Sequence, residues 1–132
     1  MPAVSLLATL VATVAGFVLG ALWYGPLFGA LWRRGLGTPP ETIRRDFSPV
    51  RTYGATFVLG FMASYVFGLY LGPDPGRIFA VVAGAAAGIF LVATSLATNY
   101  LFEGRPAALI AINGGYHVIR FTLIGLVFGL MG

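Results

Sequence analysis

The sequence contains no cysteine and a single histidine. Without cysteine, the chain cannot form disulfides, use a thiolate as nucleophile or bind a metal through sulfur. One histidine cannot complete a zinc site, and a haem would find only one histidine as axial ligand. We therefore expect neither a metal ion nor another cofactor.

Charged residues are also scarce, at 9% of the 132 residues, whereas 58% are hydrophobic and the mean hydropathy is +0.91. Soluble domains contain about 25% charged and about 45–50% apolar residues. The composition therefore indicates an integral membrane protein. Because the only markedly polar stretch covers residues 33–52, we expect one domain, residues 1–132, with its chemistry in the bilayer or at its surface.

Four mostly apolar runs are each long enough to cross the hydrocarbon core, which takes about 20 helical residues. The first has no basic segment before it and is longer than the roughly 7–15 apolar residues of a signal peptide, so we expect a retained span. The predicted fold class is all-α, with four transmembrane helices in a compact bundle. The predicted spans cover residues 3–23, 53–71, 78–102 and 107–131.

The first run is followed by "WYGPLFGALW", residues 23–32. Gly25 and Pro26 are expected to end or kink the helix, because proline lacks the amide hydrogen that a helix interior needs. The tyrosine and the two tryptophans suit the level of the lipid headgroups. We predict that residues 27–32 run along the membrane surface.

Arginines are unevenly distributed between the two ends of the predicted spans. One end has only Arg77, in the loop between the second and third spans. Basic residues in short loops remain on the cytoplasmic side, so we predict that both termini lie outside (N-out and C-out) and that residues 33–52 are cytoplasmic. Six arginines lie at that cytoplasmic end: Arg33, Arg34, Arg44, Arg45, Arg51 and Arg105.

The arginines between Arg33 and Arg51 suit the anionic headgroups of membrane lipids, which attract basic residues by roughly 1 kcal/mol each near the surface. We therefore expect membrane lipids as partners of this loop. Nucleic acid is not an expected partner, because Glu41 and Asp46 interrupt the cluster and no aromatic stacking platform accompanies it.

Every predicted span carries a pair of glycines four residues apart. In lipid, such pairs allow two helices to approach closely. The close contacts could lie within the chain or between copies of it, and we expect a homo-oligomer formed through the first or second span. The helix-packing glycines are Gly16 and Gly20, Gly68 and Gly72, Gly84 and Gly88, and Gly125 and Gly129.

The fourth run contains polar residues within "INGGYHVIRF", residues 112–121. Asn113, His117 and Arg120 fall within an arc of roughly 60° on a helical projection, with Tyr116 at its border. The third run is joined to the fourth by residues 104–106, which predicts an antiparallel hairpin. We expect the polar residues of both runs to face each other and to line a ligand site or pathway. Those of the third run are Ser95, Asn99 and Glu103.

Depth makes His117 and Arg120 the costly members of this set. His117 lies about 15 Å from Ala107, near the middle of a core about 30 Å thick, and Arg120 lies about 4–5 Å further on. No Asp or Glu shares their level. A guanidinium there costs at least about 2.5–3.5 kcal/mol unless carbonyls, water, a ligand or another subunit compensates it.

Several alternatives remain for these two residues. His117 is either a neutral imidazole hydrogen-bonded to Ser, Asn or Tyr, or a group that binds a ligand or handles protons. Arg120 either extends toward the outer surface or belongs to a hydrated cavity and binds an anionic or strongly hydrogen-bonding group. We also expect Gly114 and Gly115 to loosen the helix so that backbone carbonyls join the lining.

Enzyme functions are disfavoured by the residues themselves. No carboxylate lies within reach of His117 to complete a Ser–His–acid arrangement, and "GAAAG" at Gly84–Gly88 lacks the lysine of a phosphate-binding loop. We predict a passage or carrier for a small polar or anionic solute. The alternative is a structural or regulatory subunit of a membrane assembly.

Three stretches together resemble a small bacterial membrane family known as domain of unknown function 1761. They are "WYGPLFGALW", "NYLFEGRP" and "INGGYH". The resemblance covers essentially the whole chain, although Gly25 replaces a serine of the family. It implies four spans, a single domain and a bacterial membrane, and we expect the cytoplasmic membrane. It implies no established activity, cofactor or catalytic residue.

The predicted topology can be tested by labelling engineered cysteines on intact cells. Asp74→Cys should react with a membrane-impermeant maleimide, whereas Glu41→Cys should react only after the membrane is permeabilised. The chain without cysteine gives the background labelling. The reverse pattern would contradict the orientation that the arginines predict.

Overall fold

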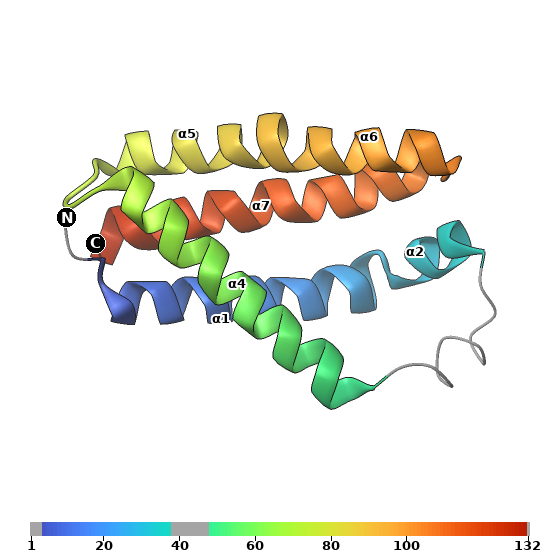
Figure 1. The fold of residues 1–132 in the computed structure, drawn as a ribbon, viewed down its shortest axis with the longest axis horizontal. Helices are drawn as coiled ribbons and strands as arrows, with labels where there is room; N and C mark the ends of the chain where they lie inside the picture. The colour runs from blue at the N-terminus through green and yellow to red at the C-terminus, as the bar shows by residue number, and fades with distance from the viewer. Residues whose placement is uncertain (1–3, 38–47, 132) are drawn as a thin grey trace.

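The structure of the chain, a computed structural model, describes residues 4–37 and 48–131. Regular structure in these residues is entirely helical (Figure 1). Four segments are long and apolar enough to cross a membrane, which agrees with the predicted integral membrane protein: Leu6–Leu27, Pro49–Leu71, Arg77–Glu103 and Ala107–Met131. The fourth coincides with the predicted run, and the second begins at Pro49 instead of residue 53.

The first span consists of α1 (Leu6–Leu22) and the π-helical turn η1 (Trp23–Leu27), and α2 (Gly29–Leu36) follows it. Pro26 lies inside η1 and has no amide hydrogen to donate. The amide of Phe28 bonds to the carbonyl of Trp23, five residues back, at 2.8 Å. The predicted break at Gly25 and Pro26 is confirmed, and the helix after it extends to Leu36.

Capping residues define the second span, α4 (Pro49–Leu71). The Ser48 hydroxyl accepts a hydrogen bond from the amide of Arg51, and proline occupies the first turn, where its missing amide hydrogen costs nothing. Gly72 ends the helix with a φ of 76°, and a side chain at its position would contact nothing within 4 Å. The prediction that Gly72 packs against another helix is therefore wrong, since it is a turn residue.

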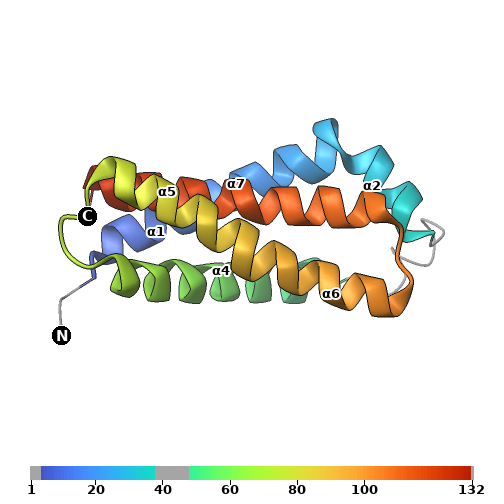
Figure 2. The same cartoon turned by 90° about the horizontal axis from the view of Figure 1, so that it is seen from above.

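The third span is α5 (Arg77–Ala87), the π-helical turn η2 (Gly88–Ala93) and α6 (Thr94–Glu103), and the fourth is α7 (Ala107–Met131). They form the predicted antiparallel hairpin along most of their length (Figures 1 and 2). Glycines set their separation. A Cβ atom on Gly88 would lie 2.6 Å from the Val118 Cα, and one on Gly129 would lie 3.0 Å from the Arg77 Cα.

The other paired glycines accept side chains of α7. A Cβ atom on Gly16 would lie 3.2 Å from the Arg120 Cγ, and one on Gly20 would lie 3.3 Å from the Tyr116 hydroxyl. One on Gly68 would lie 2.7 Å from the Phe128 ring. These glycine faces of α1 and α4 are occupied within one chain. The predicted homo-oligomer stays a prediction.

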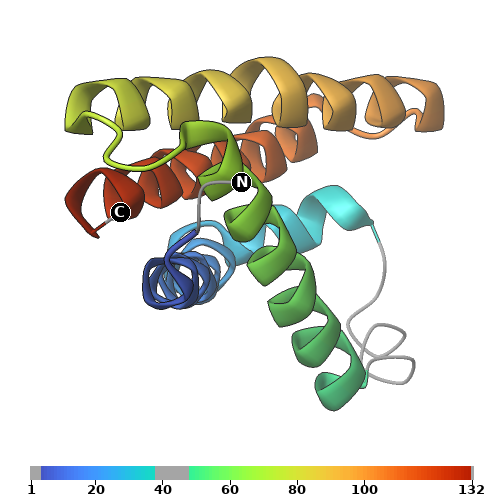
Figure 3. The ribbon, with the colours of Figure 1, turned by 60° about the vertical axis from the view of Figure 1, so that its left-hand side comes forward.

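The helices leave one side of the predicted bundle open. α4 packs on α1 and touches α7, but it has little direct contact with α5 or α6. Its first half lies well away from α6 in two views (Figures 1 and 3). A shared core lies where α1, α4, α5 and α7 meet, and its buried residues are Ala8, Ala12, Phe67, Leu71, Ala80, Phe121, Ile124 and Phe128.

Both described ends of the chain lie at one end of the molecule, where α1 begins and α7 ends (Figure 1). Arg33 and Arg51 are exposed at the opposite end. Glu41, Arg44, Arg45 and Asp46 lie outside the described residues. The side of the membrane on which each end lies stays a prediction.

Glycine contacts of α7 should dominate stability. We expect Gly125→Ala to destabilise the protein by about 1–3 kcal/mol, because the new methyl group would overlap the Ala80 backbone, whose carbonyl carbon would lie 2.8 Å away. The measurement is equilibrium unfolding in mixed micelles. Gly54→Ala is the control, because nothing lies within 4 Å of its position in α4, and it should stabilise the helix by about 0.5–1 kcal/mol. Equal losses in both variants would contradict the close contact.

Candidate functional site

The polar face of α7 is turned toward α1. The Tyr116 hydroxyl donates a hydrogen bond to the Gly16 carbonyl oxygen at 2.9 Å. Because Gly16 and Gly20 have no side chains, α1 leaves room for the Arg120 stem and the Tyr116 ring. The glycine pair of the first span therefore accommodates the polar residues of the fourth.

A second group of polar contacts lies closer to the start of α7. The Trp23 indole Nε1 donates to the Ile112 carbonyl oxygen at 2.8 Å, and the Tyr24 hydroxyl donates to the Asn113 Oδ1 at 2.6 Å. The Asn113 Nδ2 in turn donates to the Tyr100 hydroxyl at 2.9 Å. We call Trp23, Tyr24, Tyr100 and Asn113 the Asn113 cluster.

The Asn113 cluster joins the three stretches that carry the family resemblance. Trp23 and Tyr24 belong to "WYGPLFGALW", Tyr100 to "NYLFEGRP", and Asn113 to "INGGYH". Gly115 makes this meeting possible, since a Cβ atom there would lie 3.1 Å from the Trp23 ring. Segments far apart in sequence thus form one hydrogen-bonded unit within the spans of the structure.

Ring contacts connect this cluster to the deeper residues of α7. The Tyr24 ring meets the Tyr116 ring edge-on, with 5.4 Å between centroids, and the Tyr116 ring lies 4.9 Å from the His117 ring. The Arg120 Nε donates a long hydrogen bond of 3.4 Å to the His117 Nδ1. To accept that hydrogen, Nδ1 must carry a lone pair.

Arg120 has few partners for its charge. Its guanidinium carbon lies 4.8 Å from the centroid of the Phe121 ring, a cation–π contact. Its Nη1 approaches α4, where a Cβ atom on Gly60 would lie 3.9 Å away. Within residues 4–37 and 48–131, neither Nη atom makes a hydrogen bond and no carboxylate contacts the side chain.

Ser64 is a second polar group without a partner. It follows Gly60 by one helical turn, so both residues lie on the same face of α4. The Ser64 side chain is fully buried, and its Oγ has no hydrogen-bond partner in the described part of the chain. A buried hydroxyl without a partner costs about 1–3 kcal/mol. Two side chains of the described residues, Arg120 and Ser64, thus have unpaired hydrogen-bond donors.

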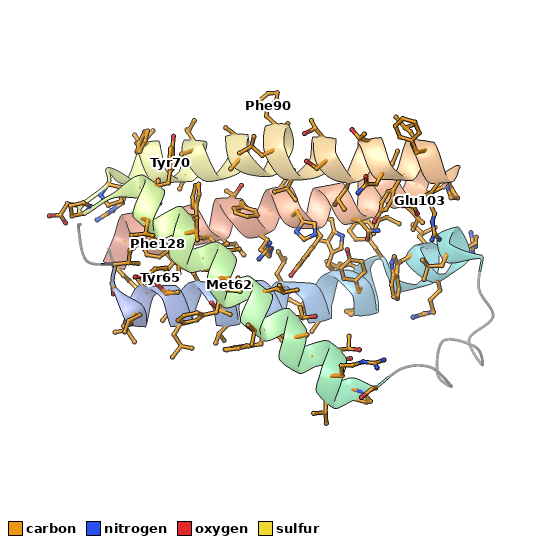
Figure 4. All side chains as sticks on the ribbon, in the orientation of Figure 1. Met62, Tyr65, Tyr70, Phe90, Glu103 and Phe128 are labelled. Atoms are coloured by element: carbon orange, nitrogen blue, oxygen red, sulfur yellow. The ribbon has the colours of Figure 1, made fainter. Side chains whose placement is uncertain are left out.

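The polar residues predicted to line the site from α6 do not meet those of α7. Ser95, Asn99 and Glu103 are all exposed, and the Ser95 hydroxyl donates to the Leu91 carbonyl of its own helix. Figure 4 shows Glu103 near the far end of α6. The prediction that these residues face Asn113, His117 and Arg120 is wrong. Close packing requires small residues, so α7 lies against Ala93 instead, and Tyr100 reaches Asn113.

The prediction of a loosened fourth helix is also wrong. α7 is continuous from Ala107 to Met131, and Gly114 packs 3.4 Å from the Ala93 Cβ, measured from an ideal Cβ position. The irregular turns are η1 and η2, in the helices beside it. Gly114 and Gly115, which were expected to loosen the helix, are therefore residues that contact neighbouring helices.

The site thus separates into a satisfied part and an unsatisfied part. In the Asn113 cluster, each polar side chain has a partner, which favours a structural role. Arg120 and Ser64 have donors to spare, which favours binding of an acceptor. No group of three His, Asp or Glu side chains in residues 4–37 and 48–131 could hold a metal ion.

Trp23, Tyr24 and Tyr100 are not among the site residues predicted from the sequence, and the first two were expected at headgroup level. The hydrogen-bonding needs of these side chains could have indicated that they belong together. Buried Tyr and Trp need a partner for their polar atoms, and Asn113 is an amide with two donors and an acceptor in an otherwise apolar run.

The hydrogen bond between Tyr24 and Asn113 can be tested by a double-mutant cycle. Tyr24→Phe and Asn113→Leu should be coupled by about 0.6–1.7 kcal/mol in unfolding free energy, the range found for hydrogen bonds between membrane helices. Tyr70→Phe is the control, because Tyr70 is exposed near the end of α4. The effects of Tyr70→Phe and Asn113→Leu on the unfolding free energy should simply add. Additive effects of Tyr24→Phe would contradict the contact.

Comparison with known proteins agrees with the resemblance seen in the three stretches. A family model described as "Protein of unknown function (DUF1761)" matches residues 7–129. No curated protein and no solved structure is significantly similar to the chain. The match covers nearly all of the four spans and every residue of the Asn113 cluster. On this evidence, the chain belongs to the DUF1761 family.

Proposed function

We propose that this protein binds a small anionic solute at Arg120, in the membrane interior, and acts as a passage or carrier for it. One observation carries the proposal. The guanidinium lies between α1, α4 and α7 without a carboxylate or a hydrogen-bonded Nη atom in the described part of the chain. An anion would remove the cost of this uncompensated charge.

The groups around Arg120 suit an anion. The guanidinium offers two parallel donors that match the oxygens of a carboxylate or phosphate. His117 accepts from Nε, which leaves the outer nitrogens free for a ligand. Gly16 and Gly60 keep the space beside the side chain open. Ser64, one helical turn after Gly60 on α4, adds a hydroxyl that needs an acceptor.

Mobility of α4 would give such a ligand access. This helix rests on α1 and has little contact with α5 or α6, whereas α7 is held closely by α5 and by the Asn113 cluster. Among α1, α4 and α7, which surround Arg120, α4 would therefore lose the fewest contacts with the rest of the protein if it shifted. A shift at Gly60 would expose or cover the guanidinium, as required of a carrier.

The alternative is a structural or regulatory subunit of a membrane assembly. The open side between α4 and α6 favours it, because a neighbouring helix could complete the bundle there. A homo-oligomer remains part of this alternative, but not through Gly16, Gly20 or Gly68, which α7 and Val4 already cover. Native mass spectrometry in lipid would show whether copies associate.

We also propose an orientation of the protein in the membrane and the type of membrane that contains it. The exposed Arg33, Arg34 and Arg51 would lie at anionic headgroups on the inner face of a bacterial cytoplasmic membrane. The anion would then meet Arg120 beyond the Asn113 cluster, on the way to the outer side.

The proposed function can be tested by anion flux into liposomes, with acetate, nitrate and phosphate as solutes. Arg120→Leu should reduce flux by at least about tenfold, the factor that corresponds to about 1.4 kcal/mol. It should fold normally or melt at a higher temperature, because removal of a half-buried charge without a counter-charge is favourable. Arg120→Lys should retain part of the activity, since it keeps the charge without the planar fork.

Arg105→Gln is the matched control. It removes an arginine from an exposed ion pair with Glu103, 40% and 49% exposed, and should leave flux and stability nearly unchanged. If Arg120→Leu retains full flux, Arg120 serves no solute. If it is destabilised and the wild type carries no anion, assembly is the better interpretation.

A further inference from the structure

An open cavity of about 740 Å³ lies between α4 and the α5–η2 segment, and Met62, Val66 and Phe90 on its walls are exposed. Met62, Val66 and Tyr70 form its α4 wall, and Figure 4 marks Met62 and Tyr70 along that helix. Ala86 and Phe90 lie on the opposite wall, and Phe121 of α7 lines it as well. The volume is within the roughly 300–1,000 Å³ that small-molecule sites occupy. The cavity exists because α4 and α5 do not pack together.

Phe121 connects this cavity to Arg120. Its ring lines the cavity and also lies 4.8 Å from the guanidinium carbon of Arg120. Gly60, which Arg120 approaches on α4, precedes the cavity residue Ala63 by three positions and so lies on the same side of the helix. Arg120 itself does not line the cavity, but the Phe121 ring contacts both the apolar space and the unneutralised charge.

The two features have complementary chemistry. The cavity is lined almost wholly by hydrocarbon, with Tyr70 as the polar exception. The adjoining guanidinium requires an acceptor with negative charge. Together they match a molecule that carries one anionic group at the end of a hydrocarbon chain.

Depth excludes an ordinary phospholipid from making both contacts. Arg120 lies about 20 Å from Ala107 along α7, within a hydrocarbon core about 30 Å thick. A phospholipid headgroup stays at the surface, so its phosphate would not reach that level. A single-chain molecule with a small terminal group has no such limit.

We propose that the site takes a single-chain amphiphile with a terminal carboxylate, which pairs with Arg120 while the hydrocarbon chain lies in the cavity between α4 and α5. This proposal rests on the proposed role of Arg120 as an anion site and names the class of its ligand. Carboxylate and guanidinium form two parallel hydrogen bonds, a strong pairing where water is absent.

Selectivity would come from the head of the ligand more than from its chain. A chain that moves from lipid into the cavity leaves one apolar environment for another, so it gains little hydrophobic free energy. The cavity therefore selects by shape, and the ion pair supplies most of the preference. A long-chain alcohol should bind far more weakly than the carboxylate of the same length.

Photo-crosslinking in nanodiscs tests the proposal, with a photoactivatable palmitate as the probe. Its adducts should map to residues 62–70 and 83–92. Unlabelled palmitate should compete about tenfold better than palmityl alcohol, because only the carboxylate forms the ion pair. Arg120→Leu should reduce labelling of these residues by about the same factor.

Ala86→Phe tests the cavity, because the larger side chain would fill it. Ala86 lines the cavity but is not part of the buried core, so the fold should tolerate the change. Val82→Phe is the matched control, since Val82 is exposed on the same helix and does not line the cavity. Ala86→Phe should abolish labelling, and Val82→Phe should not change it.

The outcomes separate this proposal from the proposed function. If acetate flux depends on Arg120 but palmitate does not label the cavity, the amphiphile is the wrong ligand and the anion site stands. If palmitate and palmityl alcohol compete equally and Arg120→Leu has no effect, the cavity holds ordinary lipid chains, and the proposal is overturned. Association of a second copy that blocks labelling would likewise overturn it.

Discussion

Close approach of backbones is the constraint on which this structure depends. Lipid surrounds apolar side chains as well as a protein core does, so helices associate only where their surfaces fit closely. α7 meets this condition on two sides. Gly84, Gly88, Gly125 and Gly129 bring it against α5, while Gly16 and Gly20 bring α1 against its polar face. Its polar residues lie in the interior because the packing glycines of a neighbour leave room for them.

The same constraint explains why α4 stands apart. Gly68 admits the Phe128 ring and Val4, and Gly60 lies beside Thr13 and Arg120, so α4 follows the groove between α1 and α7. Nothing comparable joins it to α5, where Met62, Val66 and Phe90 are bulky and exposed. The open side and the cavity are thus consequences of where small residues occur. They arise while α7 stays continuous from Ala107 to Met131.

Span number and the break at Pro26 could be predicted, because hydrophobic length and a missing amide hydrogen act locally. The partners of each polar residue could not. A helical projection groups Ser95 with Asn99 but does not say which helix that face meets, and the face toward α7 is decided by Ala93 and the glycines opposite it. Arg120 was singled out by its charge and depth alone. Tyr24 and Tyr100 were missed, since tyrosine near a span end also fits the headgroup level.

The contrast between neighbouring polar groups separates scaffold from function. Asn113 makes two strong hydrogen bonds through Tyr24 and Tyr100, and a group satisfied in this way fixes helices in place without further need of a ligand. Arg120 shares the same helix face, yet it has a 3.4 Å hydrogen bond, an aromatic ring and no counter-charge among the described residues. Packing alone does not require a guanidinium there, because a leucine would fill similar space at lower cost. This contrast supports the proposal that Arg120 binds a ligand while the Asn113 cluster holds the helices together, and α4, the least tightly held helix, lies over Arg120.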